Sequence, residues 1–320
     1  MEGIMVGVFG TEPEVKSIFE SSIAKKSEAE GISVFHRVDG GHRFSLLDTS
    51  DYPDRVQGYA RIASISDHAL YLFPRSGRLS SPDGELAVLL ESLGLPGTLE
   101  LVDGSVSPET AASALKGTTA ASYRVEERTS TSSAIDLSYT RPRQDWPSKG
   151  SLVYIDRAFS VKGVGTVALG FVLAGGISIH DQLRAIPGPD DLKIDVKGIQ
   201  VNDVDVESAG RGIRVGLSLR GVEAKDLDNS HWLDDGSFDL TDSPAFRIAK
   251  SPFYRQEVVG RDLHIQLPGE MLPTSLSDED SDLVKASLPV PIPVWEGMRA
   301  ALIDLNGKAL RVVGGATFIL

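Results

Sequence analysis

The sequence predicts an α/β domain followed by two small β-barrels, and three observations support this fold class. Residues 1–140 alternate short apolar runs with stretches of helical periodicity, a pattern typical of a parallel sheet wrapped by helices. Residues 141–150 contain two prolines and no hydrophobic periodicity, so we expect a linker there. Beyond the linker, helical patterns almost vanish, and short β-branched segments interrupted by glycine, proline and aspartate favour closed barrels.

The elements of the first domain follow from its apolar runs. A short apolar run predicts a buried strand, whereas apolar residues three or four positions apart predict a helix. Strands are expected at Ile4–Phe9, Phe44–Leu47, Ala69–Phe73, Thr98–Val102 and Ser122–Glu126. Helices are expected at Glu14–Lys25, Val56–Ala63, Asp83–Leu93 and Pro108–Leu115.

The strands of the second half are short and β-branched. They are expected at Val153–Ile155, Gly165–Val172, Gln182–Ala185, Lys193–Gln200 and Arg214–Leu219. A second set of such segments begins near Ala245 and ends with Leu310–Leu320. We therefore expect an α/β domain at 1–147, a barrel at 148–240 and a second barrel at 241–320.

Composition excludes several classes of protein. With 41% hydrophobic residues and no run of about eighteen apolar ones, the 320-residue chain is expected to be soluble and to contain no transmembrane helix. Its N-terminus has no basic stretch before a long apolar one, so we expect a cytoplasmic location. The absence of cysteine excludes disulfides and thiolate metal sites, and six scattered histidines argue against a zinc centre.

The net charge of the chain is −13, and no basic tail is present. A protein that binds nucleic acid mainly through its phosphates normally carries a basic patch. Bulk electrostatic binding of DNA or RNA is therefore disfavoured, whereas local recognition of an RNA end is compatible with the composition.

One motif in the first domain concerns phosphate binding. Gly10–Ser17 reads Gly-Thr-Glu-Pro-Glu-Val-Lys-Ser, which keeps the first glycine and the final Lys16 and Ser17 of a phosphate-binding loop. In such a loop the backbone amides face the phosphates, the lysine reaches the β- and γ-phosphates, and the serine holds Mg²⁺. Val15 stands where the loop requires glycine, and two glutamates add negative charge beside the expected anion. The chemistry of the motif is damaged.

A second stretch resembles a known family. Asp156–Gly170 reads Asp-Arg-Ala-Phe-Ser-Val-Lys-Gly-Val-Gly-Thr-Val-Ala-Leu-Gly, and Val196–Glu223 adds an Ile-Gln segment and an acidic loop. These residues resemble the second domain of translational GTPases of the elongation factor Tu superfamily, most of all its selenocysteine-specific branch. The tail Leu310–Leu320 resembles the closing strands of the third domain. The resemblance implies a P-loop GTPase-like doubly wound domain, then translation-factor domains 2 and 3, and a role in protein biosynthesis.

The resemblance also implies an RNA-binding pocket in the second domain. In elongation factor Tu the matching strand helps to form the pocket for the terminal adenosine and amino-acid end of aminoacyl-tRNA. The matching residues here are Val161, Gly163, Val167 and Gln200, with Gln200 at a position where the elongation factor has Glu. A glycine permits a bulge or the close approach of a ligand, and the valines keep apolar surface beside it. The alternative is that these residues serve only to fold the barrel.

The motifs of a GTPase can be assigned through the same resemblance. Gly10, Lys16, Ser17 and Asp48 match residues that hold nucleotide and Mg²⁺, so GTP or GDP with Mg²⁺ would be the cofactor of any residual site. Asp48–Tyr52 reads Asp-Thr-Ser-Asp-Tyr where the family has Asp-Thr-Pro-Gly-His. The glycine that contacts the γ-phosphate and the histidine that orients the attacking water are therefore both replaced.

The remaining GTPase motifs have changed too. Gly31–Val34 resembles a remnant of switch I, with serine in place of the metal-sensing threonine. Val102–Ser105 lacks the guanine-reading Asn-Lys-x-Asp motif, and Glu126–Arg128 replaces Ser-Ala-Lys. Together these changes predict a degenerate domain that hydrolyses no GTP, has no catalytic residue and requires no cofactor.

Three functions are compatible with the sequence. The first is a translation protein that binds aminoacyl-tRNA or a ribosomal element through its second domain without a GTPase cycle. The second is a protein-interaction scaffold derived from the same fold, and the third is a protein that still binds GTP weakly. The chain has no Gly-x-Ser-x-Gly or His-Glu-x-x-His motif, so independent hydrolase chemistry is not expected.

Overall fold

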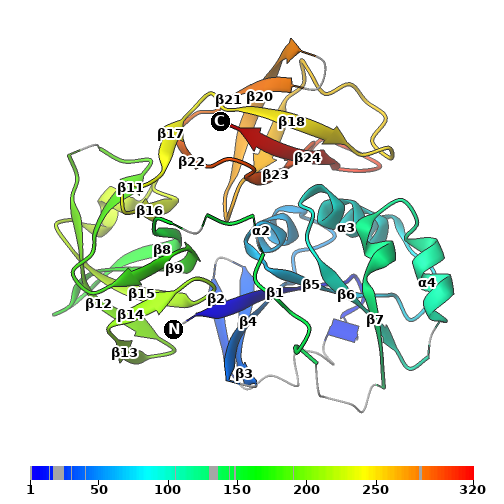
Figure 1. Cartoon of the computed structure of the whole chain (residues 1–320), viewed down its shortest axis with the longest axis horizontal. Coiled ribbons are helices and arrows are strands. Elements are labelled where there is room, and N and C mark those ends of the chain that lie inside the picture. Colours follow the sequence, from blue (N-terminus) through cyan, green and yellow to red (C-terminus); the bar gives the residue numbers. More distant parts are fainter. Residues whose placement is uncertain are drawn as a thin grey trace.

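The fold is described from a computed structural model that contains one α/β unit and two β-barrels (Figure 1). The description covers all residues except 1, 14, 17–24, 30, 40, 105, 130–135, 144, 148, 190 and 281–282. Among the residues covered, no helix is long and apolar enough to cross a membrane.

The first unit is built on a seven-stranded sheet of order β2-β3-β4-β1-β5-β6-β7. Its strands are β1 (Gly3–Phe9), β2 (Lys25–Ala29), β3 (Ile32–Asp39), β4 (His42–Thr49), β5 (His68–Leu72), β6 (Gly97–Val102) and β7 (Arg124–Arg128). Its helices are α2 (Gln57–Ile65), α3 (Ser81–Ser92), α4 (Pro108–Ala114) and the 3₁₀ turn η1 (Thr119–Ser122). The α/β class expected from the sequence is confirmed.

The sheet is mixed, which corrects the expectation of a parallel sheet. Strands β4, β1, β5, β6 and β7 are parallel, whereas β3 is antiparallel to both β2 and β4. Since β3 ends at Asp39 and β4 begins at His42, the connection is too short for the crossover that parallel strands require. The helix expected at Glu14–Lys25 is wrong at its end, because Lys25 begins β2, and most of its other residues lie outside the described ranges.

Helix α3 illustrates how local sequence starts an element. The side chain of Asp83 accepts a hydrogen bond from the Ser80 amide at 2.7 Å, and Ser80 caps the Asp83 amide in return. This reciprocal capping, with proline in the first turn, satisfies amides that would otherwise lack partners. Three leucines of α3 are buried: Leu86, Leu89 and Leu90.

The second unit is a closed ring of strands with an apolar interior. Its sheet has the order β11-β16-β8-β9-β15-β12-β13, and pairing of β11 with β12 closes the ring. The strands are β8 (Leu152–Val161), β9 (Gly165–Ala174), β11 (Gln182–Ile186), β12 (Ile194–Val201), β13 (Val204–Val206), β15 (Arg214–Arg220) and β16 (Trp232–Asp234). A small sheet of β10 (Gly176–Ser178) and β14 (Ser208–Gly210) and the 3₁₀ turn η2 (Ala224–Leu227) accompany them.

The third unit is a closed six-stranded barrel of order β18-β21-β20-β19-β23-β24. Its strands are β18 (Ala245–Lys250), β19 (Leu263–Gln266), β20 (Met271–Asp280), β21 (Leu283–Ser287), β23 (Arg299–Ile303) and β24 (Val312–Ile319), and β17 (Asp239–Thr241) pairs with β22 (Ile292–Val294). The barrel lies over α2 and α3 in Figure 1. A Cβ on Gly315 of β24 would lie 2.3 Å from the Ser92 carbonyl oxygen, so glycine permits the close contact with α3.

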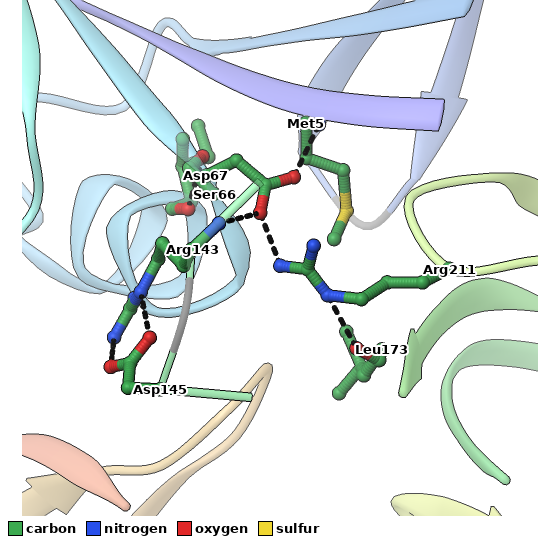
Figure 2. Close-up of polar contacts among 8 residues, drawn as sticks. Met5, Ser66, Asp67, Arg143, Asp145, Leu173 and Arg211 are labelled. Carbon is green, nitrogen blue, oxygen red and sulfur yellow. Dashed lines mark hydrogen bonds and ion pairs between the residues drawn. The ribbon is translucent and has the colours of Figure 1, made fainter. Parts of the chain in front are cut away.

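The expected linker is part of the packed core, where all three units meet. Trp146 is buried, and the indole nitrogen of Trp295 donates to the Asp145 carbonyl oxygen at 3.0 Å. Figure 2 shows the buried carboxylate of Asp67, which accepts from the Met5 amide at 2.9 Å and the Arg143 amide at 3.0 Å.

Arg211 joins the second unit to the same carboxylate. Its guanidinium binds Asp67 and also donates to the Leu173 carbonyl oxygen at 3.0 Å (Figure 2). Nearby, the Gly3 amide donates to the Arg211 carbonyl oxygen at 2.8 Å. The units are therefore in direct contact at this junction, while the boundaries expected at 147 and 240 stay predictions.

Candidate functional site

The structure brings together three of the four residues assigned to nucleotide binding. Gly10 follows β1, and Asp48 lies near the carboxyl end of the neighbouring strand β4. The ammonium group of Lys16 lies 2.9 Å from Oδ1 of Asp48 and donates to the Thr49 carbonyl oxygen at 2.6 Å. Ser17, the fourth residue, lies outside the described ranges.

Tyr59 of α2 closes this cluster, and the sequence did not point to it. Its hydroxyl lies 2.9 Å from the Gly10 carbonyl oxygen and 3.1 Å from Oδ1 of Asp48, and the Gly10 amide donates to it at 3.3 Å. Burial, followed by the charge of Asp48, raises the pKa of Tyr59 well above its ordinary value, so the hydroxyl stays protonated. The Gly10 amide and the Lys16 ammonium, two donors of the loop that resembles a phosphate-binding motif, thus bond to protein acceptors.

Val15 has a structural role in the same loop. It is 1% exposed and packs in an apolar cluster with Val6, Val8 and Leu72. A phosphate-binding loop has glycine at this position, whereas here the side chain of Val15 is part of the hydrophobic core.

Tyr52, at the position where the resemblance implies a water-orienting histidine, takes part in the contact with the third unit. Its hydroxyl donates to the Pro82 carbonyl oxygen at 2.6 Å and lies 3.2 Å from Glu85. The guanidinium of Arg311, from the third unit, pairs with Glu85 at 2.5 Å and lies 5.6 Å from the Tyr52 ring centre. Burial first, and then Glu85, raises the pKa of Tyr52, so it is no general base at neutral pH.

The region expected to read guanine contains internal ion pairs. Asp103, at a positive φ of 57°, pairs with Arg75. Arg128 of β7 pairs with Glu100 of β6, which is fully buried. Burial raises the pKa of Glu100 and outweighs the opposing effect of Arg128. Residues 32–34 begin strand β3, which pairs on both sides, Val102 ends β6 and is followed by a turn at 103–104, and 126–128 belong to β7.

The second unit carries a groove of about 680 Å³ on the outside of its barrel. Val161, Val167 and Gln200 line it, together with Gly198 and Gly216 of the facing strands. Gly163 lies outside the lining: it occupies the turn between β8 and β9 with φ of 84°, and a Cβ there would have open space. Three of the four residues assigned to the aminoacyl-tRNA pocket therefore share one groove.

The groove continues into a polar cleft between the first and second units. Leu169, Gln200 and Gly216 line both, and Ser27, His36 and Arg214 line the cleft of about 270 Å³ beyond them. Arg214 pairs with Asp156 at 3.0 Å and donates to the Ser27 hydroxyl at 3.0 Å. Sequence reasoning missed these residues because they come from strands β2, β3, β8 and β15, which only the fold brings together.

Within the described part of the chain, no group of three or more histidine, aspartate or glutamate side chains could hold a metal ion. The carboxylate of the cluster around Lys16 is that of Asp48, which forms an ion pair with Lys16.

Comparisons with known sequences find relatives that match nearly the whole chain and relatives that match only part of it. No protein-family model matches the chain. An uncharacterised protein of Methanocaldococcus jannaschii is 27% identical over 319 residues, which cover 98% of this chain and 99% of that protein. The selenocysteine-specific elongation factor of the same organism is 45% identical over 73 residues, and that of Mus musculus is 32% identical over 114 residues. These matches span only 15% and 19% of the two factors.

Solved structures extend the likeness to the whole chain. A bacterial selenocysteine-specific elongation factor matches with a TM-score of 0.82 and 16% identity, over 99% of this chain and 58% of that one. Elongation factor SelB from Methanococcus maripaludis, in complex with the GTP analogue GPPNHP, matches with a TM-score of 0.80 and 18% identity, over 100% and 79%. The resemblance stated from the sequence is confirmed for the fold: this chain has the same α/β unit followed by two β-barrels as these selenocysteine-specific elongation factors.

Proposed function

We propose that this translation-factor-like protein binds the 3′ end of an aminoacyl-tRNA in the groove of its second unit, and that it does so without a GTPase cycle. The observation that carries the proposal is the groove itself, which runs from Val161 and Val167 into the polar cleft at Arg214. An apolar surface suits a base, and a polar chamber beyond it suits an aminoacyl group with its ester.

The state of the phosphate loop supports the second half of the proposal. A nucleotide would have to break the Lys16–Asp48 pair and displace the Tyr59 hydroxyl from Gly10. It would find valine at position 15, where a glycine would let the backbone approach the phosphates, and tyrosine in place of histidine at position 52. We infer that these residues now hold the first unit together.

The experiment measures the affinity of the full-length protein for one tRNA in its aminoacylated and deacylated forms. We expect tighter binding of the aminoacylated form, with no change when GTP, GDP or Mg²⁺ is added. Titration of GTP or GDP with Mg²⁺ into the protein alone should give no heat of binding.

Two variants test the place of binding. Gly198 and Gly216 lie in strands at ordinary backbone angles, where a new Cβ would be 3.7 Å from Ser218 and 3.4 Å from Leu169. Gly198→Leu and Gly216→Leu therefore fill the groove without straining the backbone, and each should weaken binding of aminoacylated tRNA at least tenfold. Gly84→Leu, in α3 with open space around its Cβ, is the matched control.

Negligible binding of both tRNA forms would contradict the proposal, and a protein partner that co-purifies would then favour the scaffold function. Saturable heat on addition of GTP would contradict the loss of the nucleotide cycle.

A further inference from the structure

A pocket rich in arginine lies where the first unit, the linker and the third unit meet. Its volume is about 430 Å³, and its charged lining residues are Arg141, Arg143 and Asp145 of the linker segment and Arg299 of β23. The start of β5 at His68 and of β6 at Gly97 forms another wall. Because β5 and β6 begin here, the pocket is at the opposite edge of the sheet from the phosphate loop, which follows the carboxyl end of β1.

The pocket has an excess of positive charge within an acidic protein. Three guanidinium groups face one carboxylate among the lining residues, whereas the whole chain carries a net charge of −13. Asp145 is bound by Arg143 through both nitrogens of one edge, with Nε to Oδ1 at 2.9 Å, and lies 3.9 Å from Arg299. The single negative charge of Asp145 is therefore shared between Arg143 and Arg299.

Arg141 and Arg299 keep binding capacity for an anion. Arg141 donates from Nη1 to the carbonyl oxygens of Ser138 and Thr140, both at 2.7 Å, which orients the group without neutralising its charge. Arg299 is 44% exposed at its side chain, and its only ion pair among the described residues is the 3.9 Å contact with Asp145. Among the described residues neither guanidinium has a two-point ion pair with a carboxylate, and the edge of a guanidinium suits the oxygens of a phosphate, which it binds in pairs.

The guanidinium of Arg299 lies close to the backbone of Gly94. Gly94 has φ of 57°, and a Cβ there would lie 1.8 Å from Nη1 of Arg299. Only glycine allows the guanidinium to lie against this turn. On another wall, the ring of Tyr139 is covered by Arg124 at 3.5 Å, which holds one face of the aromatic ring in place.

We propose that this pocket binds a small phosphorylated compound, whose phosphate oxygens lie between Arg141 and Arg299. The volume falls in the range of small-molecule sites, roughly 300 to 1,000 Å³. The pocket and the groove of the second unit share no lining residue, so they are separate sites.

The test is calorimetric titration of inorganic pyrophosphate into the full-length protein at low ionic strength. We expect saturable binding that Arg299→Gln and Arg141→Gln each weaken at least tenfold. Arg220→Gln, at an exposed arginine of β15, makes the same change of charge and should leave the affinity unaltered. Thermal melting of each variant confirms folding, and if Arg299→Gln does not fold, the exposed Arg141 still allows the test.

Three results would overturn the proposal. The first is no saturable binding of pyrophosphate by the wild-type protein. The second is an equal loss in Arg299→Gln and Arg220→Gln, which would mean a general effect of net charge. The third is dependence on Arg299 for a single-stranded RNA oligonucleotide but not for pyrophosphate, which would assign the pocket to a nucleic-acid backbone.

Discussion

At the scale of one residue, Tyr52 has a packing role at a position where the resemblance implies a histidine. A histidine that orients water must reach solvent, whereas Tyr52 is 8% exposed and bonds to Pro82 and Glu85. Its ring also lies beside Arg311 of the third unit. The substitution therefore stabilises a contact between units at a position where the resemblance implies chemistry.

His68 provides a prediction at the same scale. Burial lowers its pKa to about 4, and its Nε2 lies 2.8 Å from the Thr98 hydroxyl. The unfolded chain takes up a proton on this residue near its ordinary pKa of about 6.5, whereas the folded chain does not until about 4, so the unfolded state binds more protons between these values. The free energy of unfolding should fall as the pH falls through this window, by about 2 kcal/mol between pH 7 and pH 5.

The measurement is urea denaturation at both pH values for the wild type and His68→Gln. The other titrating groups are the same in both proteins, so the wild type should lose more stability than the variant. Equal losses would exclude His68 as the cause.

At the scale of elements, the segment that resembles switch I lies in the antiparallel strands at one edge of the first sheet. The segment that resembles the switch begins β3, in which residues 32–39 pair with β4 and residues 32–36 also pair with β2. The backbone hydrogen bonds of this segment are therefore made to the neighbouring strands of the sheet. In the GTPase mechanism such a segment is ordered by the γ-phosphate and Mg²⁺.

Hydrogen exchange tests this interpretation. The amides of β3 should be protected in nucleotide-free protein, since they pair with neighbouring strands, and the protection should not change on addition of GTP and Mg²⁺. Strand β24 of the third barrel is the internal reference. Protection of β3 that arises only with nucleotide would show that a switch survives.

At the scale of the whole molecule, ion pairs between the units hold one arrangement. Asp67 pairs with Arg211 between the first and second units, and Glu85 pairs with Arg311 between the first and third. Both carboxylates are buried. Because a buried carboxylate without its cation is costly, separation of the units would expose or strand these charges.

Arg211→Met should therefore lower the free energy of unfolding by about 3 kcal/mol, measured by urea denaturation. The control is Arg157→Met in the same unit, an exposed arginine whose loss should change stability by about 0.5 kcal/mol or less. Asp67→Asn combined with Arg211→Met should recover part of the loss, because the buried charge is then absent. Equal effects of the two arginine variants would contradict the role given to the pair.

The elements that the sequence predicted are those with apolar patterns. Strands β1, β5 and β6 were expected within one residue of each end, because their runs of Ile, Val, Leu and Ala are local signals. Strand β2 was missed because Lys-Lys-Ser-Glu-Ala has no apolar run, and its pairing depends on the edge that β3 presents. In the site, motif spacing identified Lys16 and Asp48, but nothing local marks Tyr59 or the pairing of Glu85 with Arg311.

The sequence by itself determined the order of elements, the fold class of an α/β unit and two barrels, and the differences at Val15 and Tyr52 from the GTPase motifs that the resemblance implies. These features depend on short-range patterns of side chains. The tertiary structure alone decided that Lys16 turns to Asp48 and Tyr59, that the groove opens into the cleft at Arg214, and that arginines gather around Arg299. Those arrangements depend on contacts between residues far apart in the chain, whose geometry no local pattern contains.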